Sequence, residues 1–325
     1  MIGKVTPSDL EALVFDRTGA PDEDVVQGPA YGEDTAAVRI GDRTLVINTD
    51  PISLAVERIG SLGVNVACND VAASGARPRW LSNVIFLPGE NHDMLDRITA
   101  QIDEAASAVG VAIVGGHSEY APELEQPLLS LTCLGVTDRY VPSGGAQPGD
   151  AVILTKGAGI EGTAVLATDF RAALEGQVDP ATIDAGAAFF SDVSVIRDAE
   201  ILGSRASAMH DPTEGGLIDG LLELAVASGA VLDITRSEIP IREATAAITA
   251  AMDVDPLRIF GSGALVATVP QGDAEAALEA LAAAGIEAAV IGSVRGLEAD
   301  ERPGLRIDGE AITEPVRDDL YQFWE

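Results

Sequence analysis

The chain has 325 residues and a formal net charge of −32, because 52 Asp and Glu residues face only 20 Lys and Arg. The acids are spread along the chain, a pattern that favours a protein kept soluble in a high-salt cytoplasm, where salt screens self-repulsion. No basic stripe is present to neutralise phosphates, so nucleic-acid binding is not expected. No apolar segment is long enough to span a bilayer and no signal-like start is present, so we expect a cytoplasmic protein.

The length predicts one large domain or two, and a hydrophobic content of 47% is sufficient to fill a core in each. Cys68 and Cys133 have the spacing of neither a metal site nor a disulfide framework. Both are predicted to be core residues.

The first half of the chain alternates between strand and helix patterns. After a short helical start, the periodicity predicts the following elements in chain order: strands at 35–40 and 44–50, a helix at 61–74, a strand at 80–88, a helix at 94–110, and strands at 111–116 and 128–138.

A turn-rich segment at 141–150, VPSGGAQPGD, is the predicted domain boundary. A second alternating series begins at 151 with AVILTK, includes a helix near 186–202, and ends in a strand at 288–296. The sequence therefore predicts two α/β (α+β) domains, at 1–145 and 146–325, each a sheet with helices on one face.

Three acids stand at the ends or edges of predicted elements. Asp34 follows Glu33 in GEDTAAV, Asp50 follows Thr49 at the end of a strand, and Asp70 follows Asn69 inside the small-residue helix. Strand ends and loops gather at one rim of a sheet, so these carboxylates could converge and would need a cation such as Mg²⁺. Alternatively, each is a solvated turn residue.

Two glycine-rich segments are candidate phosphate cradles: GGHSE at 115–119, after a strand, and KGAGIEG at 156–162, which opens a helix. Plain turns explain both equally well. GAGIEG also matches a dinucleotide fingerprint, but no strand pattern follows its helix, which argues against a nicotinamide enzyme.

MHDPTEGGL at 209–217 is the last candidate segment. Thr213 is a plausible helix N-cap, and a capped helix explains the Pro, Thr and Glu of this segment. It does not explain both His210 and Asp211 at the end of a strand.

Taken in order, these motifs resemble those of the PurM-like superfamily, which includes aminoimidazole ribonucleotide synthetase, selenophosphate synthetase, thiamine-monophosphate kinase and the hydrogenase-maturation factor HypE. The similarity is strongest to HypE. The matching motifs are GEDTAAV (32–38), NTD (48–50), NDVAASGA (69–76), GGHSE (115–119) and HDPTEGGL (210–217).

The resemblance implies a homodimer joined through the N-terminal sheets, with ATP bound between two halves of the site. It implies transfer of the γ-phosphoryl group of Mg·ATP to an oxygen or selenium nucleophile, with small helical residues leaving room for the triphosphate. The implied Mg²⁺ ligands are Asp34, Thr49, Asp50 and Asp70; the implied nucleotide contacts are Asn69, Gly115, Gly116, Ser118, Gly157 and Gly159; and the implied catalytic residues are Asp211 and His117.

The sequence also departs from its relatives. The chain ends RDDLYQFWE without the cysteine on which HypE acts, so we expect it not to run that reaction on itself. His117 stands where the kinase branch has an acid, and the reactive N-terminal cysteine of selenophosphate synthetase, with its neighbouring lysine, is missing.

Three hypotheses follow. The first is a HypE-like Mg·ATP-dependent enzyme that activates an amide-like or other oxygen on a small or protein-borne substrate. The second is a small-molecule kinase resembling thiamine-monophosphate kinase. The third is a non-catalytic, nucleotide-binding maturation partner.

Overall fold

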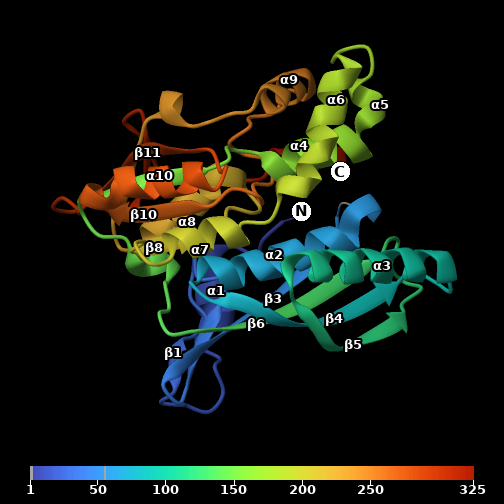
Figure 1. Ribbon diagram of the computed structural model, residues 1–325, viewed down its shortest axis with the longest axis horizontal. Helices are drawn as coiled ribbons and strands as arrows, with labels where there is room; N and C mark the ends of the chain where they lie inside the picture. Colours follow the sequence, from blue (N-terminus) through green and yellow to red (C-terminus); the bar gives the residue numbers. More distant parts are fainter. Residues whose placement is uncertain (1–2, 55) are drawn as a thin grey trace.

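The computed structural model describes residues 3–54 and 56–325, and two β-sheets organise them (Figure 1). The predicted fold class is confirmed: the protein is a mixed α/β structure with one sheet in each half of the chain. No helix within the described ranges is both long and apolar enough to cross a membrane.

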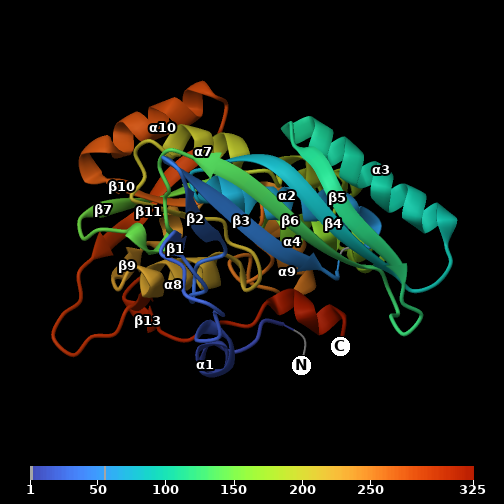
Figure 2. The same ribbon diagram turned by 90° about the horizontal axis from the view of Figure 1, so that it is seen from below.

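The N-terminal sheet has the strand order β1-β2-β3-β6-β4-β5, in which only β4 and β5 pair in parallel. Its strands are β1 (Val25–Gln27), β2 (Ala36–Ile40), β3 (Arg43–Ile52), β4 (Arg77–Leu87), β5 (Ala112–Tyr120) and β6 (Leu128–Thr137). Two long helices, α2 (Ile59–Ala73) and α3 (His92–Val109), cover one face, and the other face is left open in the single chain (Figure 2).

Helix α3 shows how local sequence builds this layer. Ile98, Ile102 and Ala106 recur at helical spacing and form its buried stripe. The Asn91 side chain accepts a hydrogen bond from the Met94 N–H at the N-terminus, and Gly110 ends the helix in the left-handed conformation.

The C-terminal sheet has the order β13-β12-β9-β11-β7-β10-β8. Its strands are β7 (Asp150–Thr155), β8 (Ala208–His210), β9 (Val231–Ile234), β10 (Val266–Pro270), β11 (Ala288–Arg295), β12 (Gly304–Ile307) and β13 (Glu310–Ile312). Val152 and Leu154 pack against α8 (Gly216–Ala227) on one face.

On the other face, Ala151 and Ile153 pack in the same cluster as α7 (Ile196–Leu202) and α10 (Ala274–Ala283). The prediction that helices cover only one face of each sheet is therefore wrong for the second sheet. The reason is that β7 is buried on both faces, as a continuous apolar run such as AVIL requires.

A helical subdomain lies beside this sheet. It contains α4 (Ile160–Asp169), α5 (Arg171–Leu174), α6 (Pro180–Ala187) and α9 (Glu243–Met252), and a short helix α1 (Pro7–Leu10) lies near the start of the chain. Aromatic rings of the last turn pack into it: Phe323 and Trp324 each lie 5.2 Å, centroid to centroid, from Phe170.

Helix α2 lies between the two halves of the molecule (Figure 1). Its small residues are explained by packing: a Cβ on Gly60 would lie 2.6 Å from the Ile98 carbonyl oxygen, and one on Gly63 would lie 2.7 Å from Leu131 Cδ1. The prediction that they leave room for a triphosphate is not supported at these positions. Cys68 and Cys133 are both buried in this core, as predicted, with their sulfurs 3.6 Å apart.

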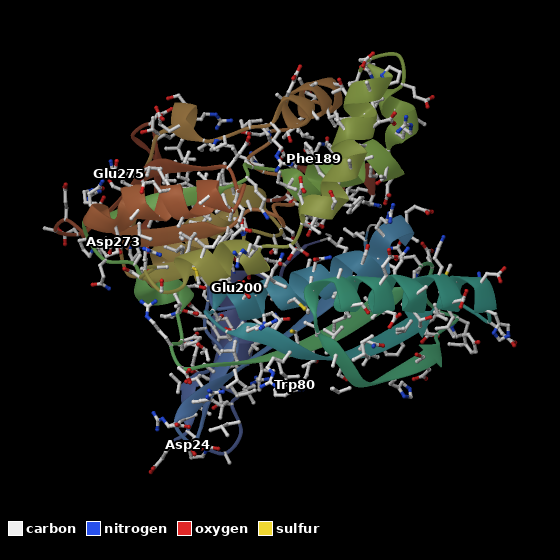
Figure 3. The ribbon with its side chains drawn as sticks, in the orientation of Figure 1. Asp24, Trp80, Phe189, Glu200, Asp273 and Glu275 are labelled. Atoms are coloured by element: carbon white, nitrogen blue, oxygen red, sulfur yellow. The ribbon has the colours of Figure 1, made fainter. Side chains whose placement is uncertain are left out.

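Exposed acids are distributed over both halves of the chain. Asp24, Glu200, Asp273 and Glu275 are exposed residues from both halves (Figure 3). The negative charge of the sequence is therefore spread over both halves of the molecule.

The helix predicted near 186–202 is interrupted. A short 3-10 segment at Ala188–Asp192 is followed by three residues outside any helix, 193–195, before α7 begins. That interruption contacts the N-terminal domain and bears on the site described next.

Candidate active site

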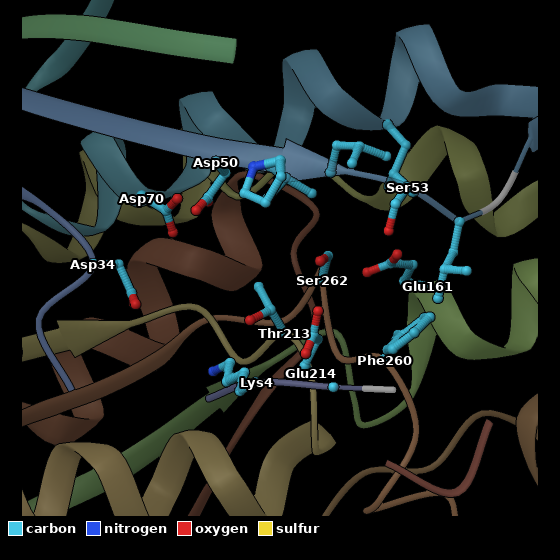
Figure 4. Close-up of a pocket in the computed structure, with 16 residues that line it drawn as sticks. Lys4, Asp34, Asp50, Ser53, Asp70, Glu161, Thr213, Glu214, Phe260 and Ser262 are labelled. Atoms are coloured by element: carbon cyan, nitrogen blue, oxygen red, sulfur yellow. The ribbon is translucent and has the colours of Figure 1, made fainter. Parts of the chain in front are cut away.

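Carboxylates from both halves of the chain cluster beside one cavity. Asp34 precedes β2, Asp50 lies on β3, Asp70 on α2, and Asp211 directly after β8. The first three line a cavity of about 340 Å³ (Figure 4), and Asp211 lies close enough to Asp70 to affect its ionisation. The structure thus brings together three of the predicted metal ligands and the predicted catalytic acid.

Asn48 holds two of these acids in place. Its Nδ2 donates to the Asp34 carbonyl oxygen at 3.2 Å and to Asp50 Oδ2 at 3.3 Å. Strand alternation places Asn48 and Asp50 on the same face of β3, toward α2. Asn48 is the first residue of the NTD motif, but its role was not predicted from the sequence.

Two of the carboxyls are buried and incompletely partnered. Asp70 is 3% exposed and Asp211 is 1% exposed, and one oxygen of each has no hydrogen-bond partner among the described residues. Burial raises the pKa of Asp70, and the nearby carboxylates Asp211, Asp50 and Asp34 raise it further. Burial also raises the pKa of Asp211. Such a cluster is unfavourable without a proton or a cation between its members.

The donor set fits a hard divalent cation, although no group of three or more His, Cys, Asp or Glu side chains within residues 3–54 and 56–325 is already arranged to hold one. Mg²⁺ usually keeps several waters and takes only one or two carboxylates together with substrate phosphates. The unpartnered oxygens of Asp70 and Asp211 are the observation that supports this fit.

An ion-pair network centred on the buried side chains of His210 and Glu223 borders the carboxylates. His210 Nδ1 lies 3.2 Å from Asp34 Oδ2, and its Nε2 lies 3.1 Å from Glu223 Oε2. Lys4 Nζ contacts the other oxygen of Glu223 at 2.9 Å. Burial alone would lower the pKa of His210, but Asp34 and Glu223 raise it to about 9.

Lys4 and Asp34 also line a second cavity of about 650 Å³ that shares Gly3 and Glu214 with the first. Sequence reasoning gave no role to Lys4 or Glu223. The available signal was that Lys4 is one of only two lysines in the chain.

Apolar side chains also line the first cavity: Phe260, Leu62 and Val66. Phe260 lies with the buried polar residue Glu161 at the end away from the carboxylates, and the buried Ser262 also lines the cavity (Figure 4). The Trp324 ring stacks on Phe260 with a centroid separation of 6.2 Å, which fixes this wall. Sequence reasoning missed Glu161 and Ser262.

Two residues predicted beside the carboxylates point elsewhere. Thr49 is exposed on the opposite face of β3, where its hydroxyl lies 2.9 Å from that of Thr132, because successive strand residues alternate in direction. Asn69 is buried, and both ends of its amide bond the backbone of the interrupted stretch, at Val193 O (2.8 Å) and Val195 N (2.9 Å). Thr49 as a metal ligand and Asn69 as a nucleotide contact are therefore corrected.

The predicted phosphate cradle at Gly157 and Gly159 is also corrected. Backbone N–H groups of this loop already donate to protein carbonyls: Ala158 to Pro240 (3.0 Å), Glu161 to Ser262 (3.1 Å) and Gly162 to Phe260 (2.8 Å). A Cβ on either glycine would lie 2.8 Å from a backbone oxygen, so close packing explains both residues. Thr213 is not a cap either, because Gly215 occupies the N-cap position of α8.

Gly115, Gly116, His117 and Ser118 form part of strand β5 rather than a loop after it. They lie at the sheet edge, separated from β3 by β4 and β6, and His117 is exposed with Glu119 3.4 Å away. Within one chain these residues do not reach the carboxylates.

Comparison with known proteins matches this arrangement to one family. The model of the AIR synthase related protein N-terminal domain matches residues 32–137, and that of its C-terminal domain matches residues 147–301. A protein of Methanocaldococcus jannaschii, provisionally named a hydrogenase expression/formation protein, is 30% identical over 302 residues, 87% of this chain and 87% of that one. The chain belongs to the AIR synthase-related family.

The predicted PurM-like resemblance, closest to HypE, is thereby confirmed. Within the family, the carbamoyl dehydratase HypE of Rhodobacter capsulatus is 31% identical over 286 residues, 86% of this chain and 82% of that one. A crystal structure of the hydrogenase maturation protein HypE in complex with ATP is similar with a TM-score of 0.73 at 25% identity, covering 97% of this chain and 93% of that one. These relatives are, by their names, an enzyme and a protein that binds ATP.

Proposed function

We propose that the protein is a Mg·ATP-dependent enzyme of HypE-like type, which phosphorylates an amide-like or other oxygen of a small or protein-borne substrate and releases ADP. The observation that carries the proposal is the carboxylate cluster at the cavity, with buried unpartnered oxygens on Asp70 and Asp211. The similarity to an ATP-bound HypE supports it.

In this proposal Asp34, Asp50 and Asp70 hold Mg²⁺, with Asn48 orienting Asp50 through its 3.3 Å hydrogen bond. When bound, Mg²⁺ neutralises the phosphate charge that develops as the phosphoryl group moves. Asp211, from the opposite domain, orients the phosphoryl acceptor or a second ion.

The reaction breaks the bond between the γ-phosphorus and the oxygen that joins it to ADP, and forms a bond from the γ-phosphorus to the acceptor oxygen. For an amide acceptor, one N–H proton is released as the carbonyl oxygen becomes a phosphate ester. The protein's contribution is to position both reactants and exclude water.

A homodimer through the N-terminal sheets belongs to the same proposal. The apolar residues Ile113, Val114 and Tyr120 on β5 are 41%, 60% and 43% exposed in the single chain, and exposed apolar residues on an edge strand are typical of an interaction surface. Pairing two such sheets would bring the partner subunit's β5 to the site, and we assign Gly115, Gly116, His117 and Ser118 a nucleotide-contacting role only in that arrangement.

We propose that this reaction serves hydrogenase maturation, and the name of the Methanocaldococcus jannaschii relative, a hydrogenase expression/formation protein, supports this part of the proposal. The test is ADP release in molar KCl, with Mg·ATP and a panel of amides, carbamates and thiamine phosphate. Amide-dependent ADP release supports the proposal. Stable transfer of labelled phosphate to thiamine phosphate would favour a kinase, and no turnover with measurable ATP binding would favour a maturation partner.

A further inference from the structure

Lys4 is a basic side chain among the acids of the first cavity. Of the described residues that line this cavity, it is the only Lys, Arg or His, and the acids there are Asp34, Asp50, Asp70, Glu161 and Glu214 (Figure 4). The phosphoryl transfer described above gives Lys4 no role. Because such a transfer gathers negative charge on phosphate oxygens, a cation at this place has a chemical use.

The N-terminal segment holds the backbone of Lys4 beside the cavity. On one side, Gly3 packs so closely that a Cβ on it would lie 3.1 Å from Tyr321 Cε2. On the other side, the Thr6 side chain accepts a hydrogen bond from the Asp9 N–H and caps α1. The Lys4 side chain itself is 41% exposed, so its long, flexible stem can move while the backbone stays in place.

The Lys4 ammonium uses only one of its three N–H donors within the protein. Nζ donates to Glu223 Oε1 at 2.9 Å, and no second acceptor for it is present in residues 3–54 and 56–325. Glu223 does not depend on Lys4 alone, because His210 Nε2 lies 3.1 Å from its other oxygen. Lys4 can therefore exchange Glu223 for a more highly charged anion without leaving Glu223 unpaired.

The two cavities meet at Lys4. Gly3, Lys4, Asp34 and Glu214 line both of them, and their volumes of about 340 and 650 Å³ are of the size of ligand sites. In a phosphoryl transfer, donor and acceptor bind on opposite sides of the group that moves. With one reactant in each cavity, that group lies at the junction, beside Lys4 and the proposed Mg²⁺ ligand Asp34.

The charge of Lys4 suits this position. Burial alone would lower the pKa of Lys4, but Glu223 and then Asp34 raise it well above its ordinary value. Lys4 is therefore a cation over the whole range of pH in which the protein is expected to work, and it can neutralise phosphate oxygens without giving up a proton.

We propose that Lys4 contacts the γ-phosphoryl group: when Mg·ATP binds, the ammonium exchanges Glu223 for oxygens of the terminal phosphate. This inference deepens the proposed function and rests on it. Because ADP lacks the group that Lys4 contacts, Lys4 makes the protein distinguish ATP from ADP. The N-terminal segment then forms part of the active site.

The test compares Mg·ATP with Mg·ADP, which differ in the γ-phosphoryl group. Calorimetry in molar KCl gives both dissociation constants for the wild type, Lys4→Gln, Lys4→Met, Lys4→Arg and the control Arg17→Gln, which removes an exposed positive charge nearby in the sequence but outside both cavities. Lys4→Gln and Lys4→Met should weaken Mg·ATP about tenfold, the size expected for one hydrogen bond to a charged group, and change Mg·ADP less than about twofold. Lys4→Arg keeps the charge and should lose less, and Arg17→Gln should bind both nucleotides as the wild type does.

Equal weakening of both nucleotides in the uncharged variants would show that Lys4 only ties the N-terminal segment to α8 through Glu223. Unchanged binding of both nucleotides would show that Lys4 does not contact the phosphates. Either result overturns the inference and leaves the proposed function standing, whereas absence of Mg·ATP binding to the wild type overturns both. The melting temperature without nucleotide shows that each variant is folded.

Discussion

Asn69 Oδ1 accepts a hydrogen bond from the Val195 backbone N–H at 2.9 Å, and this contact joins the first domain to the second. The same amide donates to the Val193 carbonyl. Because both backbone groups are buried, Asn69→Ala should lower the free energy of unfolding by roughly 2–4 kcal/mol. Thermal or urea unfolding measures this. Asn65→Ala, on the same helix but part-buried and donating only to Ser61 O, is the control, and equal losses in the two variants would contradict the role.

How far sequence could predict the site depends on where each residue stands in its element. Asp50 and Asp70 were predictable because they interrupt apolar runs at element ends or inside a small-residue helix. Glu161 and Ser262 were not predictable as cavity residues, because segments about 100 positions apart in the sequence come together to line their cavity. The residues that flank each of them in the sequence give no sign of this role. Asn69 was predicted to face the nucleotide because pattern alone cannot reveal a partner at Val195.

The fold, like the site, was predictable in part from the sequence. Alternating patterns predicted most of the strands and helices, but not that β5 would continue through GGHSE to Tyr120, since glycine pairs usually mark turns. The interruption before α7 was missed because its cause is the tertiary contact with Asn69.

Replacement of Asp50 or Asp70 with Asn should separate stability from ligand binding. Removing one charge from a repelling cluster should leave the unliganded protein as stable as the wild type or more so. Stabilisation by Mg·ATP should fall sharply, because fewer ligands remain for the cation. The measurement is the melting temperature in molar KCl with and without Mg·ATP. Asp103→Asn, on the exposed side of α3, should behave like the wild type, and the metal assignment fails if all three variants keep the full ligand shift.

The proposed homodimer predicts an effect at a distance from the carboxylates. Val114→Glu places a charge on the exposed side of β5, where it should prevent sheet pairing without disturbing the core. We expect light scattering in high salt to change from a dimer to a monomer, with weaker ATP binding. A wild type that is monomeric at micromolar concentration would reject the interface.

Glu161 should make stability depend on pH in a defined direction. Burial raises the pKa of Glu161 to about 7 from 4.5, so the folded state holds a proton that the unfolded state has lost between these values. Stability contributed at this position is therefore lost as pH rises from 4.5 through 7. Glu161→Gln has no such loss, and its stability relative to the wild type should increase by up to roughly 3 kcal/mol across that window. Urea unfolding at pH 4.5 and pH 8 measures the difference. The control is Glu279→Gln, which changes an exposed acid on α10 and should differ from the wild type by the same amount at both pH values. A pH-independent difference for Glu161→Gln would show that the carboxyl is not held protonated.

Replacement of Asp211 should distinguish a role in catalysis from a role in nucleotide binding. The capped-helix interpretation of its segment no longer applies, because Gly215 is the N-cap of α8 and makes no side-chain cap. Asp211 is 1% exposed, with one unpartnered oxygen and Asp70 nearby. If it orients the acceptor or a second ion, Asp211→Asn should keep ATP affinity while ADP formation falls by about a hundredfold or more, the size expected for losing a positioning or acid–base group. Calorimetry and an ADP-release assay on the same preparation give both values. Unchanged turnover would remove Asp211 from the mechanism, and a parallel loss of ATP binding would make it a metal ligand together with Asp70.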